Sequence, residues 1–227
     1  MQGRNTQAFR DDCHRRIVEL DLLLCENGYE MRIKIASVGE PVLRSAARTL
    51  TPEEIRNQRI RDLIEHMRDT LSDAPGVGLA APQIGEPIQL AIIEDKTEYH
   101  ANLSAVDLAE RERNPVPFHV LINPQIHLVS PPEVAFFEGC LSLPGSTAIV
   151  PRARRVLVEA LDHLGQSVSI EATGWYARIL QHEIDHLHGT LYIDHMWSRS
   201  FSSLENYNRH RKLKTTAELR QAFEDRS

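Results

Sequence analysis

The feature that most constrains this chain is the pattern H-E-x-x-H, formed by His182, Glu183 and His186. On an α-helix four residues advance about 400°, so His182 and His186 project from nearly the same face, one turn apart. Glu183 lies about 100° round from His182, close enough to reach a water on a bound metal without being a ligand itself. The pattern therefore predicts a helix that carries two metal ligands and a base. Because so short a pattern also occurs by chance, the alternative is the wet face of a surface helix.

Two other segments are rich in glycine, and each contains a reactive or polar side chain that could serve the same site. Cys140 lies in the run FEGCLSLPG, whose glycines and proline predict a turn-rich segment rather than a plain strand. Upstream, residues 76–85 read GVGLAAPQIG, a glycine-rich apolar loop that holds one polar side chain, Gln83. A catalytic divalent metal needs a third protein ligand and an open position. The chain has three cysteines, and the other two, Cys13 and Cys25, lie in a charged N-terminal stretch.

In order along the chain, these segments resemble the three motifs of the peptide deformylase family, which read G-x-G-x-A-A-x-Q, E-G-C-x-S and H-E-x-x-H. Three motifs in the right order are far more specific than any one alone, and the resemblance spans roughly residues 31–200. The defining positions of the motifs are all present: Gly76, Gly78, Ala80, Ala81, Gln83, Glu138, Gly139, Cys140, Ser142, His182, Glu183 and His186.

The resemblance implies a site in which Cys140, His182 and His186 hold one divalent metal ion. Deformylases are generally iron(II) enzymes in the cell, so Fe²⁺ is the expected ion. A set of two imidazoles and one thiolate also tolerates Zn²⁺, Ni²⁺ or Co²⁺. The alternative for Cys140 is a buried thiol that binds nothing, since free cysteines usually are buried.

Catalytic roles also follow from the resemblance. Glu183 is the expected general base, which takes a proton during attack on a carbonyl and passes it to the leaving amine. The side-chain amide of Gln83 and the backbone N–H of Leu141 are the expected donors to the oxyanion. The alternative for Gln83 is a turn residue bonded to its own loop.

Three further charged residues are candidates for a supporting role. Glu138, Arg152 and Asp185 could form an ion-pair network that orients the ligating histidines. The alternative is that these residues pair only to hold the loop.

The substrate that the resemblance implies is N-formylmethionine at the start of new polypeptides, from which the formyl group leaves as formate. Helical geometry independently supports an apolar pocket, because Trp175 and Ile179 share the helical face of His182. Val77 would line the opposite side, and the backbone around Gly78 can pair with an extended peptide. The alternative is that Trp175 and Ile179 are simply core.

Trp175 is also a departure from the common pattern, because many bacterial members have a small or aliphatic residue there. Together with Ala177 and Arg178, it resembles the mitochondrial branch of the family and its bacterial relatives. A tryptophan there could narrow or reshape the pocket and so alter the substrate preference.

Composition bounds the class of protein and its partners. A net charge of −6 argues against a dedicated nucleic-acid binder, and no apolar run is long enough to span a bilayer. Three cysteines are an odd and low number, which suggests a reducing compartment without a disulfide framework. We therefore expect a cytoplasmic protein of bacterial type, with no DNA or membrane partner.

The chain divides into an N-terminal extension at residues 1–30, a catalytic domain at residues 31–200 and a partly basic tail at residues 201–227. The domain begins with a methionine, so the extension is either a translated upstream stretch or a real addition. In the tail a basic run at residues 209–214 precedes a predicted helix at residues 216–224. This run could meet the ribosome or be only a solvated face.

The predicted elements indicate an α+β fold, with mostly antiparallel sheets packed around the helix that carries H-E-x-x-H, because strands and helices do not alternate regularly. A capping box with proline at the first helical position, at residues 51–54, opens a helix. The apolar face of that helix comprises Ile60, Leu63, Ile64, Met67 and Leu71. The remaining predictions are strands at residues 89–93, 119–122, 155–161 and 167–171, an exposed polar excursion at 94–117 and the motif helix at 174–188.

Two other functions stay open at this point. An endopeptidase of the thermolysin type also uses H-E-x-x-H, with a downstream acidic residue as its third ligand. The E-G-C-L-S segment argues against that class. The second alternative is a deformylase-like module kept for binding or structure, which would have no need to keep Gln83, Cys140 and Glu183 all intact.

Overall fold

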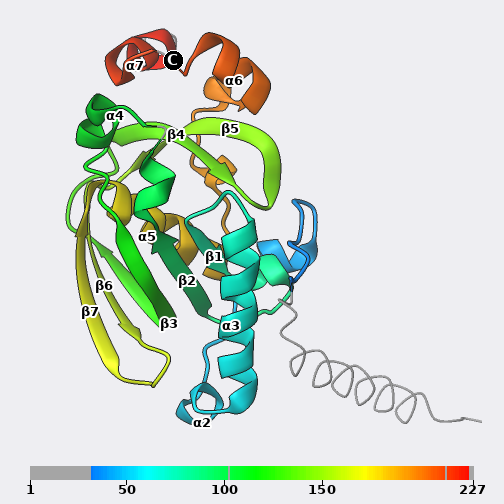
Figure 1. Ribbon diagram of the computed structural model, residues 1–227. Helices are drawn as coiled ribbons and strands as arrows, with labels where there is room; N and C mark the ends of the chain where they lie inside the picture. Colours follow the sequence, from blue (N-terminus) through cyan, green and yellow to red (C-terminus); the bar gives the residue numbers. More distant parts are fainter. Residues whose placement is uncertain (1–31, 102, 213, 225–227) are drawn as a thin grey trace, which may run out of the picture. The chain divides into compact units, whose positions relative to one another are not determined.

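The computed structural model describes residues 32–101, 103–212 and 214–224 (Figure 1). In these residues the chain folds into two sheets of antiparallel strands together with α-helices, so the α+β prediction is confirmed. The predicted N-terminal extension, which contains Cys13 and Cys25, lies outside the described residues. Within the described part, none of the helices is both long enough and apolar enough to cross a membrane.

Eight strands make up the two sheets. The larger sheet has the spatial order β1, β2, β3, β6, β7, and the smaller has the order β4, β5, β8. The strands of the larger sheet are Gly78–Ala80, Leu90–Asp95, Val116–Leu128, Arg155–Leu161 and Ser167–Thr173. Those of the smaller sheet are Val134–Cys140, Leu143–Arg152 and Ser202–Ser203. Short 3₁₀ turns lie at Pro41–Arg44, Ala81–Ile84, Thr97–His100, Tyr192–Asp194 and Ser198–Ser200.

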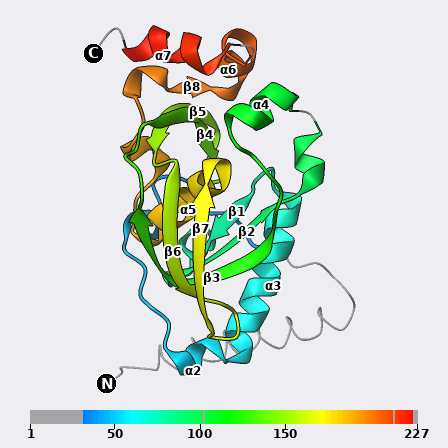
Figure 2. The same ribbon diagram turned by 90° about the vertical axis from the view of Figure 1, so that its left-hand side faces the viewer.

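Strand β2 of the larger sheet is buried on both faces. Successive residues of a strand point to opposite sides, so its side chains pack in two different apolar clusters. On β2, Ile92 packs in one apolar cluster with Met67 of α3 (Gln58–Asp73). Its neighbour Ile93 packs in another cluster with Leu180 of α5 (Gly174–Leu187). The helices can be followed in Figures 1 and 2. As a result, α5, the predicted motif helix, is fixed along the sheet by one face and keeps another face for the site.

The helix predicted from residue 51 onward is two helices, so that prediction was wrong in its extent. The capping box of Thr51 and Glu54 is present, but α2 covers only Pro52–Ile55. Asn57 then adopts an extended conformation and accepts a hydrogen bond from the N–H of Arg59, which starts α3. A side chain that can cap a new helix thereby interrupts the first one. The predicted apolar face of α3 is buried.

The segment around Cys140 is more regular than its glycines indicate. Cys140 ends strand β4, and β5 follows after a turn at residues 141–142, so the two strands form a hairpin. The register between them shifts between Glu138 and Cys140, which is where Gly139 lies. The glycine-rich loop also contains a strand, β1, which pairs with β2. Glycine therefore marks an irregular strand here rather than the absence of one.

The excursion between β2 and β3 is not exposed throughout, which corrects the prediction for residues 94–117. It contains a short helix, α4 (Ala105–Glu110), and Asp95 and Val116 near its two ends are buried. Asp95 is fully buried and the side chain of Arg113 is only 11% exposed. The two form an ion pair, which allows both charges to be buried.

Two helices follow the smaller sheet, α6 (Leu204–His210) and α7 (Thr216–Glu224). The predicted helix at residues 216–224 is confirmed. The rings of Phe137 on β4 and Tyr207 on α6 lie 4.7 Å apart, and Leu219 packs on the same apolar cluster. The C-terminal helices thus cover the side of β4 and β5 away from α5 (Figures 1 and 2).

Candidate active site

Three ligand-type side chains converge where β4 meets α5. The ligand atoms of Cys140, His182 and His186 all lie within 4.8 Å of one another, and Sγ of Cys140 lies 3.3 Å from Nε2 of His186. Cys140 is the last residue of β4, and the histidines lie on successive turns of α5 with ring centroids 5.0 Å apart. The structure therefore brings together the three residues that the sequence offers as ligands.

The donor set fits one divalent metal ion. Two imidazoles and a thiolate suit borderline cations that favour tetrahedral coordination with one open position. Two groups can donate hydrogen bonds to the sulfur, the backbone N–H of Ser142 at 3.4 Å and Nε2 of Gln83 at 3.5 Å. Burial, together with the nearby His182, holds the pKa of His186 well below its usual range, as a neutral ligand requires.

Glu138 lies beside the ligands at the centre of a buried charge network. Its Oε2 is 3.0 Å from Nδ1 of His182, and Arg152 donates to both its oxygens at 3.0 and 3.1 Å. Burial alone would raise the pKa of the Glu138 carboxyl, but Arg152, His182 and Arg178 outweigh it and hold that pKa well below its usual range. With its Nδ1 proton directed at this carboxylate, His182 presents Nε2 as a ligand atom.

The predicted trio of Glu138, Arg152 and Asp185 lies in one network, since Arg152 also donates to Asp185. Sequence reasoning missed a fourth member, Arg178, which is 3% exposed and donates to Glu138. Arg178 also donates to the carbonyls of Val150 and Val134, so it ties α5 to both strands of the hairpin. Its position four residues before His182 was the available signal, because it placed the arginine on the same helical face.

Glu183 lies against the backbone of β1. A Cβ atom at Gly78 would lie 2.4 Å from Oε1 of Glu183, so only glycine leaves room for this carboxylate. The residue is 4% exposed, and within the described residues its Oε2 has no hydrogen-bond partner. Burial raises the pKa of the Glu183 carboxyl to about 7. A carboxyl in this state can both take and give a proton near neutrality.

Gln83 combines the two alternatives raised by its position in the loop. Its Oε1 accepts a hydrogen bond of 2.9 Å from the backbone N–H of Ala80, which fixes the side chain within its own turn. Its Nε2 is thereby directed at Sγ of Cys140 and at Oγ of Ser142, at 3.5 and 3.3 Å. Leu141, the residue after Cys140, packs close to Gly76 of the same glycine-rich segment.

The ligands lie at the edge of a cavity of about 610 Å³. The four residues predicted to contact substrate, Val77, Gly78, Trp175 and Ile179, all line it. Its walls are formed by residues 74–78 and by residues 137–146, and they are predominantly apolar. Four further lining residues were not predicted to contact substrate: Ile35, Arg113, Arg178 and Leu204. The arrangement therefore places metal ligands, a buried carboxyl and an apolar cavity side by side.

A model of the polypeptide deformylase family matches residues 33–201. The chain belongs to the peptide deformylase family. It is 44% identical over 172 residues to the chloroplastic peptide deformylase 1A of Solanum lycopersicum, covering 76% of this chain and 62% of that protein. It is 46% identical over 173 residues to peptide deformylase 3 of Streptomyces avermitilis, covering 76% and 75%. The mitochondrial deformylase of Homo sapiens is 36% identical over 170 residues, covering 75% and 70%.

Among solved structures, a class I type b peptide deformylase from Acinetobacter baumannii bound to Met-Ala-Ser is similar. The TM-score is 0.65 and the identity 29%, and the match covers 74% of this chain and all of that one. The deformylase of Thermotoga maritima matches with a TM-score of 0.59 at 33% identity, covering 73% and 97%. The chain spans 62% and 64% of the length of the chloroplastic relatives from Solanum lycopersicum and Arabidopsis thaliana.

The ligand set is that of a deformylase rather than that of a thermolysin-type endopeptidase. Among the described residues, the group placed to hold a metal contains Cys140 and no carboxylate. Asp185, one of the two acidic residues between the histidines, accepts a hydrogen bond from Arg152. The third ligand of an endopeptidase is therefore replaced by the thiol of the E-G-C-L-S segment.

Proposed function

We propose that this protein is a metal-dependent hydrolase that removes the N-formyl group from N-formylmethionyl peptides and releases formate. The observation that carries the proposal is the cluster of Cys140, His182 and His186 beside buried Glu183, at the edge of an apolar cavity of about 610 Å³. The structure of the Acinetobacter baumannii relative contains Met-Ala-Ser, a peptide with an N-terminal methionine. That ligand supports the same substrate class here.

The three ligands would hold one divalent cation, and we propose Fe²⁺ in the cell, with Zn²⁺, Ni²⁺ or Co²⁺ as substitutes in vitro. When bound, such a cation supplies Lewis acidity, which acidifies a water and polarises the formyl carbonyl. Glu138 and Arg152 keep His182 in the tautomer and orientation that ligation needs, and Asp185 holds Arg152 from the other side.

Proton transfer is assigned to Glu183. Its carboxylate takes a proton from the water that attacks the formyl carbon. It then gives that proton to the amide nitrogen as the C–N bond breaks, so formate and a free amine leave. A pKa raised to about 7 by burial suits both halves of this transfer. The close approach of the Gly78 backbone restricts the position of the Glu183 carboxyl.

Charge that develops on the formyl oxygen needs donors, and we assign these to Nε2 of Gln83 and the backbone N–H of Leu141. Gln83 is held by its bond to Ala80, so its amide need not reorganise during the reaction. A donor of this kind typically contributes about 2.7–4 kcal/mol to lowering the barrier.

The methionine side chain is assigned to the cavity between Val77, Trp175 and Ile179, with the backbone near Gly78 along the peptide. Trp175, together with Ala177 and Arg178, supports a place near the mitochondrial-like branch and its bacterial relatives.

Organisation and location are part of the same proposal. Residues 1–30 are taken as an extension, residues 31–200 as the catalytic domain and residues 201–227 as a tail. The basic run at residues 209–214 is a candidate contact with the ribosome. A cytoplasmic location remains the prediction from composition.

The experiment that tests the proposal is anaerobic formate release from formyl-Met-Ala-Ser, with Fe²⁺ or Ni²⁺ loaded. Turnover in the parent protein that disappears in Cys140→Ala, but not in the matched control Cys25→Ala, supports both the reaction and the third ligand. Casein cleavage by the metal-loaded parent without formate release would favour an endopeptidase. A metal-replete parent that releases no formate contradicts the proposal.

A further inference from the structure

The excursion between β2 and β3 is clamped at its base by a buried ion pair. Asp95 at the end of β2 is fully buried, and Arg113 donates to its two oxygens from Nε and Nη2, both at 2.8 Å. Nε2 of His100, within the excursion, lies 3.1 Å from Oδ1 of the same aspartate. A bidentate pair of this geometry fixes the direction of the guanidinium as well as its position.

A second clamp holds the excursion against the start of α5. Glu112 has a φ of +48° and Gly174 a φ of +60°, both left-handed. A Cβ atom at Gly174 would lie 2.4 Å from Cβ of Glu112 and 2.8 Å from the carbonyl oxygen of Arg111, so the two backbones are in close contact. Gly174 immediately precedes Trp175. The excursion therefore packs directly against Gly174, the residue that precedes Trp175 in the cavity wall.

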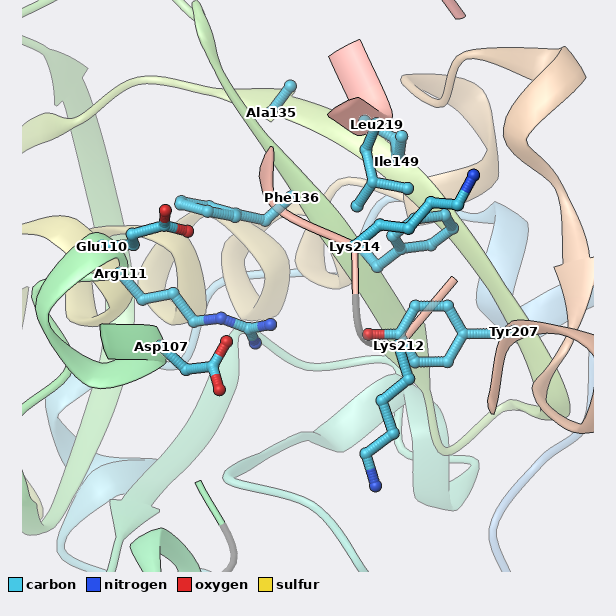
Figure 3. Close-up of a pocket in the computed structure, with 11 residues that line it drawn as sticks. Asp107, Glu110, Arg111, Ala135, Phe136, Ile149, Tyr207, Lys212, Lys214 and Leu219 are labelled. Carbon is cyan, nitrogen blue, oxygen red and sulfur yellow. The ribbon is translucent and has the colours of Figure 1, made fainter. Parts of the chain in front are cut away.

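Both arginines beside this contact lie over the ring of Trp175. The guanidinium carbon of Arg113 is 5.2 Å from the ring centroid, and that of Arg111 is 5.0 Å away. Arg113 lines the 610 Å³ cavity. Arg111 reaches the ring from a separate cavity of about 30 Å³, and Figure 3 shows it extending from the end of α4 past Phe136. Two arginines of the excursion thus lie nearest the Trp175 ring, and Arg178 of α5 lies 5.8 Å from the same centroid.

The charge of Arg113 is already compensated where it meets the cavity. Asp95 occupies two of its donor atoms and carries the opposite charge in a fully buried position. The cavity wall therefore offers a neutralised guanidinium packed on an indole, which suits an uncharged side chain better than an anion.

We propose that Arg113, oriented by Asp95, is a specificity-determining residue of the methionine pocket, because it fixes the Trp175 ring that bounds the pocket. The inference rests on the proposed deformylase function and deepens it. The residue acts on the substrate mainly through Trp175, so it should alter side-chain discrimination and KM more than kcat.

The test compares the parent with Arg113→Gln and with the double variant Asp95→Asn/Arg113→Gln, which removes both charges of the pair together. The double variant guards against misfolding, since the single change leaves a buried aspartate without its arginine. Formate release is measured with formyl-Met-Ala-Ser and formyl-Ala-Ala-Ser. Arg154→Gln is the matched control, because Arg154 binds Glu112 of the same excursion but does not line the cavity.

A second readout follows the ring itself without any turnover. The chain has two tryptophans, so Trp197→Phe leaves Trp175 as the one fluorophore of this kind. If Arg113 fixes and covers the ring, its loss shifts the Trp175 emission to longer wavelength and increases quenching by acrylamide.

The expected result is a rise of roughly tenfold in KM for the methionine substrate, with kcat little changed and with a smaller preference for methionine over alanine. The double variant should share these changes and also the emission shift, whereas Arg154→Gln should show none of them. Unchanged discrimination and emission in both Arg113 variants, in a parent that releases formate, overturns the role of Arg113 alone. A metal-loaded parent that releases no formate overturns both the proposed function and the specificity role of Arg113. No other outcome of this test contradicts the proposed function.

Discussion

Two buried glutamates beside the ligand cluster are in opposite states. Glu138 is 6% exposed and is bonded by Arg152, Arg178 and His182. Glu183 is 4% exposed and, among the described residues, its Oε2 has no hydrogen-bond partner. The pKa of Glu138 is held well below its usual range, whereas that of Glu183 is raised to about 7.

Burial is nearly equal for the two carboxyls, so the partners decide the difference. Positive neighbours and hydrogen bonds to the ionised form keep Glu138 charged, which suits a group that orients a ligand. Desolvation without such partners favours the neutral form of Glu183, which suits a group that moves a proton near pH 7. One chemical group is thus given a positioning role and a proton-transfer role by its surroundings alone.

The largest expected effect comes from removing the proton carrier. Glu183→Gln should lower kcat for formyl-Met-Ala-Ser by about 10²–10⁴-fold, the usual contribution of a positioned acid–base group. The melting temperature of this variant should not fall, because the buried carboxyl that the amide replaces forms no ion pair with any described residue. Steady-state formate release and thermal unfolding check the two parts. A variant that keeps its activity would remove Glu183 from the reaction.

The opposite pattern, a loss of stability, is expected when Glu138 is replaced. Glu138→Gln leaves Arg152 and Arg178 buried without their carboxylate, so the free energy of unfolding should fall by about 3–5 kcal/mol. Metal affinity should also fall by roughly 10–100-fold, because His182 loses the partner that orients it. Urea unfolding and competition with a chelator measure these changes.

A matched control for this variant is Glu205→Gln, which breaks an exposed pair with Arg209 on α6. Exposed pairs on a helix contribute little to stability, so the urea midpoint should hardly move. Equal losses in the two variants would contradict the central role of Glu138.

The two glutamates should also give the metal-free protein opposite pH dependences. The pKa of Glu183 rises from 4.5 to about 7 on folding, so its stabilising contribution is full below about pH 4.5 and is lost as the pH rises through about 7. At about 1.36 kcal/mol per pH unit, this loss amounts to roughly 3 kcal/mol. The pKa of Glu138 is lowered on folding, so its contribution is present above the unfolded value and lost as the pH falls.

Denaturant unfolding of metal-free parent and Glu183→Gln between about pH 5 and pH 8 isolates the Glu183 part. The variant should gain stability relative to the parent as the pH rises. A difference between the two proteins that is flat across this range would show that Glu183 titrates outside it.

Local patterns explain which parts of this site could be predicted from the sequence. The face shared by His182 and His186 follows from helical geometry, and α5 ends within one residue of the predicted bound. The apolar face of α3 follows from its period in the same way. Each of these features is determined by residues within a few positions of one another.

The remaining features depend on contacts between distant residues. Arg178 binds the carbonyl of Val134, 44 residues away, and its place on the helical face of His182 does not indicate this partner. The burial of Asp95 likewise depends on Arg113, which lies 18 residues further along in a segment whose composition reads as exposed. Charged residues are the hardest to place from sequence, because a partner that only the fold supplies decides whether they can be buried.

The last prediction concerns the position of the Glu183 carboxyl, which a substitution at a neighbouring residue can move without replacing Glu183 itself. A methyl group at Gly78 would lie 2.4 Å from Oε1 and 2.6 Å from Cδ of Glu183. Because these atoms end a flexible side chain, Gly78→Ala should displace the carboxyl rather than unfold the protein. A displacement on the order of 1 Å can cost about 100-fold in rate, so kcat should fall by about that factor while the urea midpoint stays close to that of the parent. Gly76→Ala is the comparison, because the nearest atom to its methyl is Cδ1 of Leu141 at 3.0 Å, and it should cost less activity. If the two alanine variants lose activity equally, the glycine-rich segment matters as a whole, and the position of Glu183 would not depend on Gly78 in particular.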